Sequence, residues 1–140
     1  MRFSIFIFFL LLITSCFHGN RLDEVKYDKL FHGGQSRIWM IGSSDNSENQ
    51  IASQNKFKNE ILLFSSNGNV ILTDFSKLYF GEGKKGTYSI YSNNKEIDIR
   101  FQDERWFYTF EFKNEHHIVL KPNVGSSTSQ TLELIALPEI

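Results

Sequence analysis

Residues 86–120 constrain the fold of this chain most strongly, because apolar and polar residues alternate through four successive runs within this segment. Side chains on a β-strand point alternately to its two faces, so the pattern predicts four strands that share one apolar face. A two-residue turn at Asn93–Asn94 fixes the pairing of the first two strands. The expected apolar pairs are Ile90 with Ile97 and Tyr88 with Ile99.

Two polar turns extend this sheet to a third and a fourth strand. A four-residue turn at Gln102–Arg105 brings three more aromatic residues to the apolar face, and a three-residue turn at Asn114–His116 brings two aliphatic ones. A shift of one residue in the pairing register would point the apolar side chains of a strand into water. The alternation therefore specifies which face of the sheet is buried. The expected positions are Trp106 opposite Phe101, Tyr108 opposite Ile99, Phe110 opposite Ile97, and then Ile118 and Leu120 on the fourth strand.

Four more strands are expected outside this segment. They are Ser36–Gly42, a hairpin of Ile61–Phe64 and Val70–Phe75 around Asn67–Gly68, and Thr131–Leu137. Both faces of the hairpin are apolar, and we expect Ile61, Leu63, Val70 and Leu72 on one and Leu62, Phe64, Ile71 and Phe75 on the other. Residues 22–31 are the expected cover of the second face, and residues 76–85 are expected to form a loop.

The eight expected strands predict an all-β fold, because short turns join most of them and no long crossover helix separates them. An antiparallel meander with one apolar face can roll into an up-and-down barrel, which buries that face and leaves no free edge. The alternative is a sandwich of two sheets. We expect the barrel in residues 36–140, after a tether or short helix in residues 16–35.

The N-terminus is typical of a bacterial signal peptide. Arg2 precedes an unbroken apolar run, Ile5–Ile13, which is shorter than the roughly 17 residues that a helix needs to cross a bilayer. The run ends in Ile13-Thr14-Ser15-Cys16, which resembles a lipobox. This resemblance implies that residues 1–15 are removed and that Cys16 carries a lipid anchor. The alternative is an ordinary secretory signal with an incidental cysteine.

Five further sequence features, and the order in which they follow one another, resemble the lipocalin-like lipoproteins of bacteria. The resemblance spans most of the chain after Cys16, and it implies an eight-stranded barrel in a lipid-anchored protein of the cell envelope, which we expect at the outer membrane. The features are Trp39 on the first strand, Phe64-Ser65-Ser66-Asn67-Gly68, Gly86-Thr87-Tyr88-Ser89-Ile90, Ile97-Asp98-Ile99-Arg100-Phe101 and Leu132-Glu133-Leu134.

The charged and reactive residues do not predict an enzyme, a metal site or a cofactor. The glycines of Gly81–Gly86 match the spacing of a dinucleotide-binding loop, but the residues that follow alternate like a strand and not like the helix that such a loop opens. His116 and His117 are adjacent and would point to opposite faces of a strand. Glu96 and Asp98 are expected on a solvated face. The net charge of −1 and the absence of a basic stripe exclude nucleic acid as an expected partner.

The aromatic and aliphatic residues of the apolar face are therefore the candidate functional site. An eight-stranded barrel is either filled by its own side chains or holds one small ligand, and the sequence leaves both open. Our first prediction is a small apolar ligand inside the barrel; the alternative is a filled barrel whose outer surface binds a protein or a polysaccharide. The candidate interior residues are Trp39, Tyr88, Ile90, Ile97, Ile99, Phe101, Trp106, Tyr108, Phe110, Ile118 and Leu120.

The hydroxyl group of Tyr108 is the one polar group expected deep inside this set. A buried hydroxyl needs a hydrogen-bond partner, and the apolar residues around it offer none. Water, a backbone carbonyl or a polar end of the ligand are the three possible partners.

Overall fold

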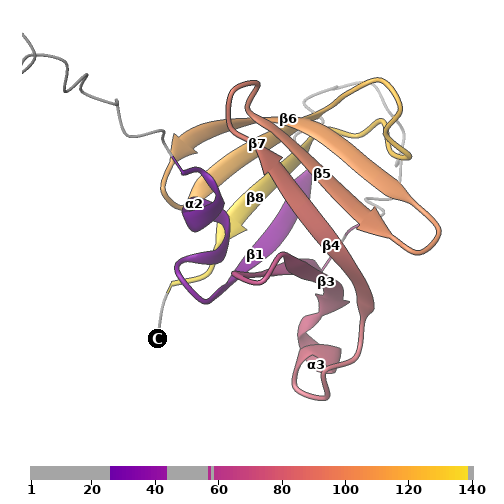
Figure 1. Ribbon diagram of the computed structural model, residues 1–140. Coiled ribbons are helices and arrows are strands. Elements are labelled where there is room, and N and C mark those ends of the chain that lie inside the picture. Colours follow the sequence, from indigo (N-terminus) through magenta and orange to yellow (C-terminus); the bar gives the residue numbers. More distant parts are fainter. Residues whose placement is uncertain (1–25, 44–56, 58, 139–140) are drawn as a thin grey trace, which may run out of the picture.

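The computed structural model describes residues 26–43, 57 and 59–138, and its strands form one closed antiparallel barrel (Figure 1). Each strand pairs with its neighbours in sequence, and β8 pairs with β1 to close the sheet. The predicted all-β, eight-stranded, up-and-down barrel is confirmed, and the closure excludes the two-sheet sandwich. The strands are β1 (Ser36–Ser43), β2 (Glu60–Ser65), β3 (Asn69–Asp74), β4 (Lys84–Tyr91), β5 (Glu96–Phe101), β6 (Arg105–Asn114), β7 (His117–Pro122) and β8 (Leu132–Ala136).

The register of β4 and β5 is the predicted one. Ile90 lies opposite Ile97, and Tyr88 lies opposite Ile99. The apolar residues of both strands face the interior, while Ser89 and Asp98 form an outward pair. The alternation of side chains, together with the short turn, was sufficient to specify this hairpin.

The predicted register of β5 and β6 is wrong by two residues. Trp106 lies opposite Ile99, and Tyr108 lies opposite Ile97. The cause is a tighter turn, in which the backbone N–H of Phe101 donates to the carbonyl of Glu104 at 2.9 Å. A shift of two residues keeps every side chain on its face, so the apolar face itself is as predicted.

The remaining pairings close the interior. Phe110 lies opposite Leu120 and Phe112 opposite Ile118, as the three-residue turn predicts. On β8, three inward residues are buried: Leu132, Leu134 and Ala136.

The predicted faces of the β2–β3 hairpin are wrong. Leu62 lies opposite Leu72, and Phe64 lies opposite Val70, so these four share the inner face. The outer face carries the remaining apolar residues of the two strands, Ile61, Leu63 and Ile71, and Phe75 belongs to a helix after β3. Since both faces are apolar, alternation alone could not assign them.

Gly68 adopts the left-handed conformation expected of the hairpin turn, with φ +83°. We expect Gly68→Val to lower the free energy of unfolding by roughly 1 kcal/mol or more, because a β-branched residue is strained at positive φ. The measurement is urea denaturation of parent and variant. An unchanged midpoint would contradict this account of the turn.

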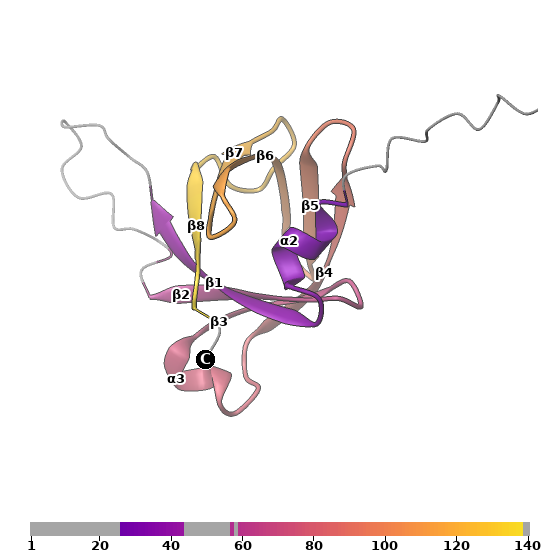
Figure 2. The same cartoon turned by 90° about the vertical axis from the view of Figure 1, so that its left-hand side faces the viewer.

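Two short helices lie near different ends of the barrel (Figures 1 and 2). Helix α2 (Asp28–His32) lies within the range predicted as a tether or short helix, and Gly33 caps its C-terminus with φ +63°. Phe31 of α2 packs against Phe64, so the predicted covering segment does contact the hairpin face that carries Leu62 and Phe64. That face is the inside of the barrel.

Helix α3 (Phe75–Leu78) replaces the first part of the loop predicted at residues 76–85. Asp74 is its N-cap, because the Asp74 carboxylate accepts a hydrogen bond from the backbone N–H of Lys77. The rest of that segment joins α3 to β4.

Candidate functional site

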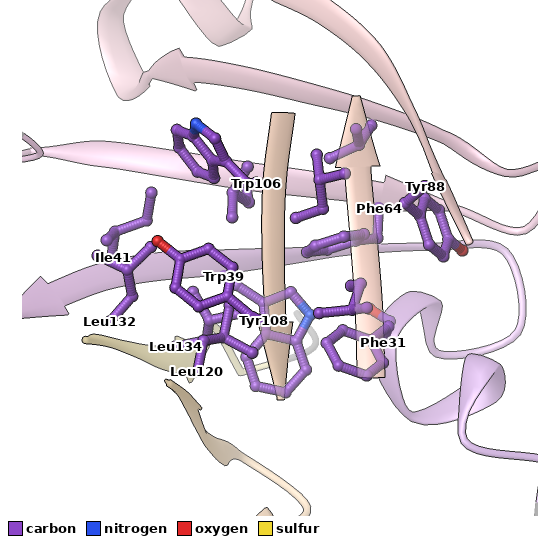
Figure 3. Close-up of a cluster of buried hydrophobic side chains, with 14 of the residues drawn as sticks. Phe31, Trp39, Ile41, Phe64, Tyr88, Trp106, Tyr108, Leu120, Leu132 and Leu134 are labelled. Carbon is purple, nitrogen blue, oxygen red and sulfur yellow. The ribbon is translucent and has the colours of Figure 1, made fainter. Parts of the chain in front are cut away.

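The structure brings the predicted interior residues together. Ten of the eleven are buried, and Ile90 is half-buried and packs against the same apolar cluster. Figure 3 shows part of this cluster. The predicted lipid-anchor residue, Cys16, lies outside the described residues.

The described side chains pack closely inside the barrel. Trp39, Trp106 and Tyr108 are 0% exposed. A cavity wide enough for a ligand would expose the side chains that line it, because even an enclosed cavity of that size admits a water-sized sphere. The described part of the barrel is thus packed like an ordinary protein core.

Aromatic rings pack against one another at both ends of the interior. At one end, the ring of Phe31 lies 5.4 Å from that of Phe64 and 5.3 Å from that of Phe110, in edge-to-face contacts. At the other end, Trp106 packs edge-to-face against Phe101 at 5.2 Å and Phe57 at 5.1 Å. Such pairs add to the stability that burial provides.

A backbone carbonyl is the partner of the Tyr108 hydroxyl. This hydroxyl donates to the carbonyl of Gln130 at 3.3 Å, and burial raises the pKa of Tyr108 to about 12. Tyr88 is held in the same way, since its hydroxyl donates to the carbonyl of Ser65 at 2.9 Å. The sequence left water, a backbone carbonyl and a ligand open as partners of Tyr108. The structure shows the carbonyl, so this hydroxyl does not need a polar group of a ligand.

The two tryptophans differ in their hydrogen bonding. The indole N–H of Trp39 donates to the carbonyl of Phe31 at 2.8 Å, which ties β1 to α2. The indole N–H of Trp106 is buried and has no acceptor among the residues that the structure describes. An unpaired buried donor costs about 1–3 kcal/mol.

Three cavities of the described residues lie at the surface of the barrel. The first, of about 480 Å³, is lined by Tyr88 and Ile90 together with residues of α2 and the β2–β3 turn. The other two, of about 300 and 560 Å³, flank Asp74 at the start of α3. Tyr88 and Ile90 thus border a surface cleft as well as the interior.

The outward carboxylate of Asp98 is buried, which the expectation of a solvated face missed. Only 2% of its side chain is exposed, because Arg100 and Arg105 cover it. Arg100 Nη2 lies 2.8 Å from Asp98 Oδ2, and Arg105 Nε lies 2.8 Å from Oδ1. Burial raises the pKa of Asp98, but the hydrogen bonds from Arg105 and Arg100 outweigh this effect and leave the pKa below its usual 3.8.

This lowered pKa predicts a pH dependence of stability. Since the folded protein holds the Asp98 proton less tightly than the unfolded chain, the charged carboxylate stabilises the fold at neutral pH. This contribution is lost as the pH falls below about 4 and through the folded-state pKa. We expect the unfolding midpoints of parent and Asp98→Asn to converge as the pH falls below about 4. A difference that stays constant as the solution is acidified would contradict the prediction.

The segment around α3 exposes three aromatic side chains. Tyr79 is 91% exposed, Phe80 is 72% exposed, and Phe75 is about half exposed. The rings of Tyr79 and Phe80 pack edge-to-face at 5.4 Å. We call these three residues the α3 tip.

Hydrogen bonds hold the backbone on both sides of the α3 tip. The hydroxyl of Thr73 donates to the carbonyl of Glu82 at 2.7 Å, and the N–H of Glu82 donates to the carbonyl of Lys77 at 3.2 Å. Gly83, with φ +151°, sits against Ile71 and Thr73, where a Cβ atom would lie 2.8 Å from that of Thr73. These contacts order the backbone that carries the three exposed rings.

Other classes of site have little support among the described residues. No group of three His, Cys, Asp or Glu side chains there is placed to hold a metal ion. The glycine-rich stretch leads into the strand β4 and not into a helix. No helix in the described ranges is long and apolar enough to cross a membrane.

Comparison with known proteins adds no family assignment. No protein-family model, curated protein or solved structure matches the chain. The likeness to a lipocalin-like barrel therefore rests on the strand order and closure described above.

Proposed function

We propose that this chain is a non-enzymatic lipoprotein of the bacterial envelope whose filled barrel binds a protein through its outer surface. The observation that carries the proposal is the α3 tip. Tyr79 and Phe80 are exposed to water side by side, and contiguous exposed apolar surface marks interaction sites. Aromatic residues are also enriched in the buried centres of protein interfaces.

The position of the α3 tip fits an anchored protein. The N–H of Ser66, in the turn between β2 and β3, donates to the carbonyl of Gln35, which follows α2. Helix α3 begins at the other end of β3, directly after Asp74. A chain attached to a membrane through Cys16 approaches the barrel through α2, and the α3 end is then free to meet a partner (Figure 2).

The anchor and the binding surface are tested separately. Cys16→Ala should abolish labelling of the chain by radioactive palmitate and leave the precursor unprocessed. Undiminished labelling would refute the lipoprotein assignment without touching the binding proposal.

The binding surface is tested by site-specific photocrosslinking in the anchored full chain. A photoreactive phenylalanine analogue at Phe80 should give one discrete protein adduct, and excess purified parent domain should suppress it. A domain carrying Tyr79→Ser and Phe80→Ser should not compete. The matched control is the same analogue at Val124, which is fully exposed on the loop between β7 and β8.

Equal adducts at both positions, or competition by the double variant, would contradict the proposal. The double variant should fold as the parent does, because both side chains face water. Binding of the purified domain to cell-wall polysaccharide through the same residues would identify a different class of partner and overturn the proposal.

A small apolar ligand inside the barrel stays a prediction. One observation favours it, namely the buried indole N–H of Trp106 without an acceptor in the described ranges. Such a ligand would have to displace side chains that now fill the interior.

A further inference from the structure

The outward face of β5 and β6 carries two arginines fixed on one carboxylate. Asp98 Oδ2 accepts hydrogen bonds from Arg100 Nε at 3.0 Å and from Arg105 Nη2 at 3.0 Å, in addition to the bonds described above. Both carboxylate oxygens are therefore engaged, by two guanidinium groups. The group of three carries a net charge of +1.

Each guanidinium keeps part of its hydrogen-bonding capacity. An arginine has five N–H donors, and in both residues the two N–H groups of Nη1 have no acceptor within the described part of the chain. The side chains of Arg100 and Arg105 are 63% and 44% exposed, so solvent reaches both of them.

The two arginines are already ordered. Their backbones are cross-strand partners, and Asp98 fixes both head groups. The guanidinium of Arg105 also lies 4.7 Å from the ring centre of Phe107, the residue opposite Asp98. A ligand that binds here does not have to immobilise two long side chains, which is a large part of the cost of using flexible cations.

We propose that Arg100 and Arg105 form a binding site for a carboxylate group on an acidic segment of a protein. Planar guanidinium groups bind carboxylates and phosphates through paired N–H donors. A net charge of +1 matches one carboxylate, whereas a phosphate group carries about −1.5 to −2. This site is separate from the α3 tip, and the inference does not depend on the function proposed for that surface.

The chain contains a matched control on β6 and β7. Glu111 lies 2.6 Å from Lys113 Nζ and 3.1 Å from Lys121 Nζ, so this group also combines one carboxylate with two cations. It has the same net charge of +1. Its lysine ammonium groups lack the planar, paired N–H donors of a guanidinium group, and the Glu111 side chain is half exposed.

The test is an NMR titration of the folded domain with sodium acetate, at ionic strength held constant with sodium chloride. The Nε–H resonances of Arg100 and Arg105 should shift along one saturable curve, while the signals of Lys113 and Lys121 should show no saturable change. Linear shifts, or shifts that chloride reproduces, would overturn the proposal. Phosphate that binds more tightly than acetate would overturn the choice of carboxylate.

Two variants extend the test to a peptide. A capped tetraglutamate peptide should bind the parent, Arg100→Gln should weaken its binding at least fivefold, and Lys113→Gln should leave it unchanged. Equal effects of the two substitutions would show that the peptide is attracted by any positive charge of the protein. They would refute a specific site at Arg100 and Arg105. Because the acetate titration uses the unmodified protein, a variant that fails to fold does not leave the proposal untested.

Discussion

Phe31→Ala should lower the free energy of unfolding by about 3–5 kcal/mol, the range for removing a fully buried aromatic ring. Phe31 is 0% exposed and is the one side chain of α2 that enters the barrel's apolar cluster fully. Its ring contacts Phe64, Phe110 and Phe112 edge-to-face. The substitution thus removes the contacts that close this end of the interior.

The measurement is urea denaturation followed by tryptophan fluorescence. Phe31→Leu is the matched control, because it keeps most of the apolar volume, and we expect it to cost clearly less than the alanine variant. The backbone carbonyl that accepts from Trp39 is present in all three proteins. If Phe31→Ala cost less than about 1 kcal/mol, α2 would not be an integral part of the core.

Gly86→Ala should lower the free energy of unfolding by about 1–3 kcal/mol, because the added methyl group has no room. A Cβ atom at Gly86 would overlap the backbone carbonyl of Arg100 and would lie 2.8 Å from Cδ1 of Phe101. Strands β4 and β5 would have to separate locally to admit it.

Gly42→Ala is the matched control. Gly42 is also a strand glycine, and its nearest neighbours to a new Cβ atom belong to Glu133 at an ordinary 3.7 Å. We expect this variant to unfold within about 0.5 kcal/mol of the parent. Similar losses at both glycines would mean that the close approach at Gly86 is not the cause.

Most of the fold was predictable because strict alternation and short turns act together. In β4 and β5 the polar and apolar residues separate cleanly, and the short turn fixes the register that pairs Tyr88 with Ile99 and Ile90 with Ile97. The β5–β6 register was missed because a shift of two residues keeps the same face, so only the geometry of the turn decides it. The inner and outer faces of the β2–β3 hairpin were predicted wrongly because neighbouring residues such as Leu62 and Leu63 are both apolar.

The outer surface was less predictable, since its properties depend on contacts between strands. Asp98 looked solvated in the sequence, and its burial depends on Arg105 from the next strand. Phe75 was predicted in a strand, and Tyr79 and Phe80 in a loop, although Asp74 before them is a favoured N-cap residue type. The exposure of Tyr79 and Phe80 follows from that backbone, and not from any sequence pattern.

The close packing of the interior leads us to expect that no ligand binds inside the barrel. The measurement that decides this is a titration of the domain with fatty acids, porphyrins and apolar dyes, followed by tryptophan fluorescence and by the methyl signals of Ile97 and Ile99. Trp39 and Trp106 are the only tryptophans and both lie fully buried in the interior, so they report on any ligand there. We expect no saturable change in either signal. A saturable one-site change in fluorescence, with matching shifts of the two methyl groups, would contradict the claim and establish an interior ligand site.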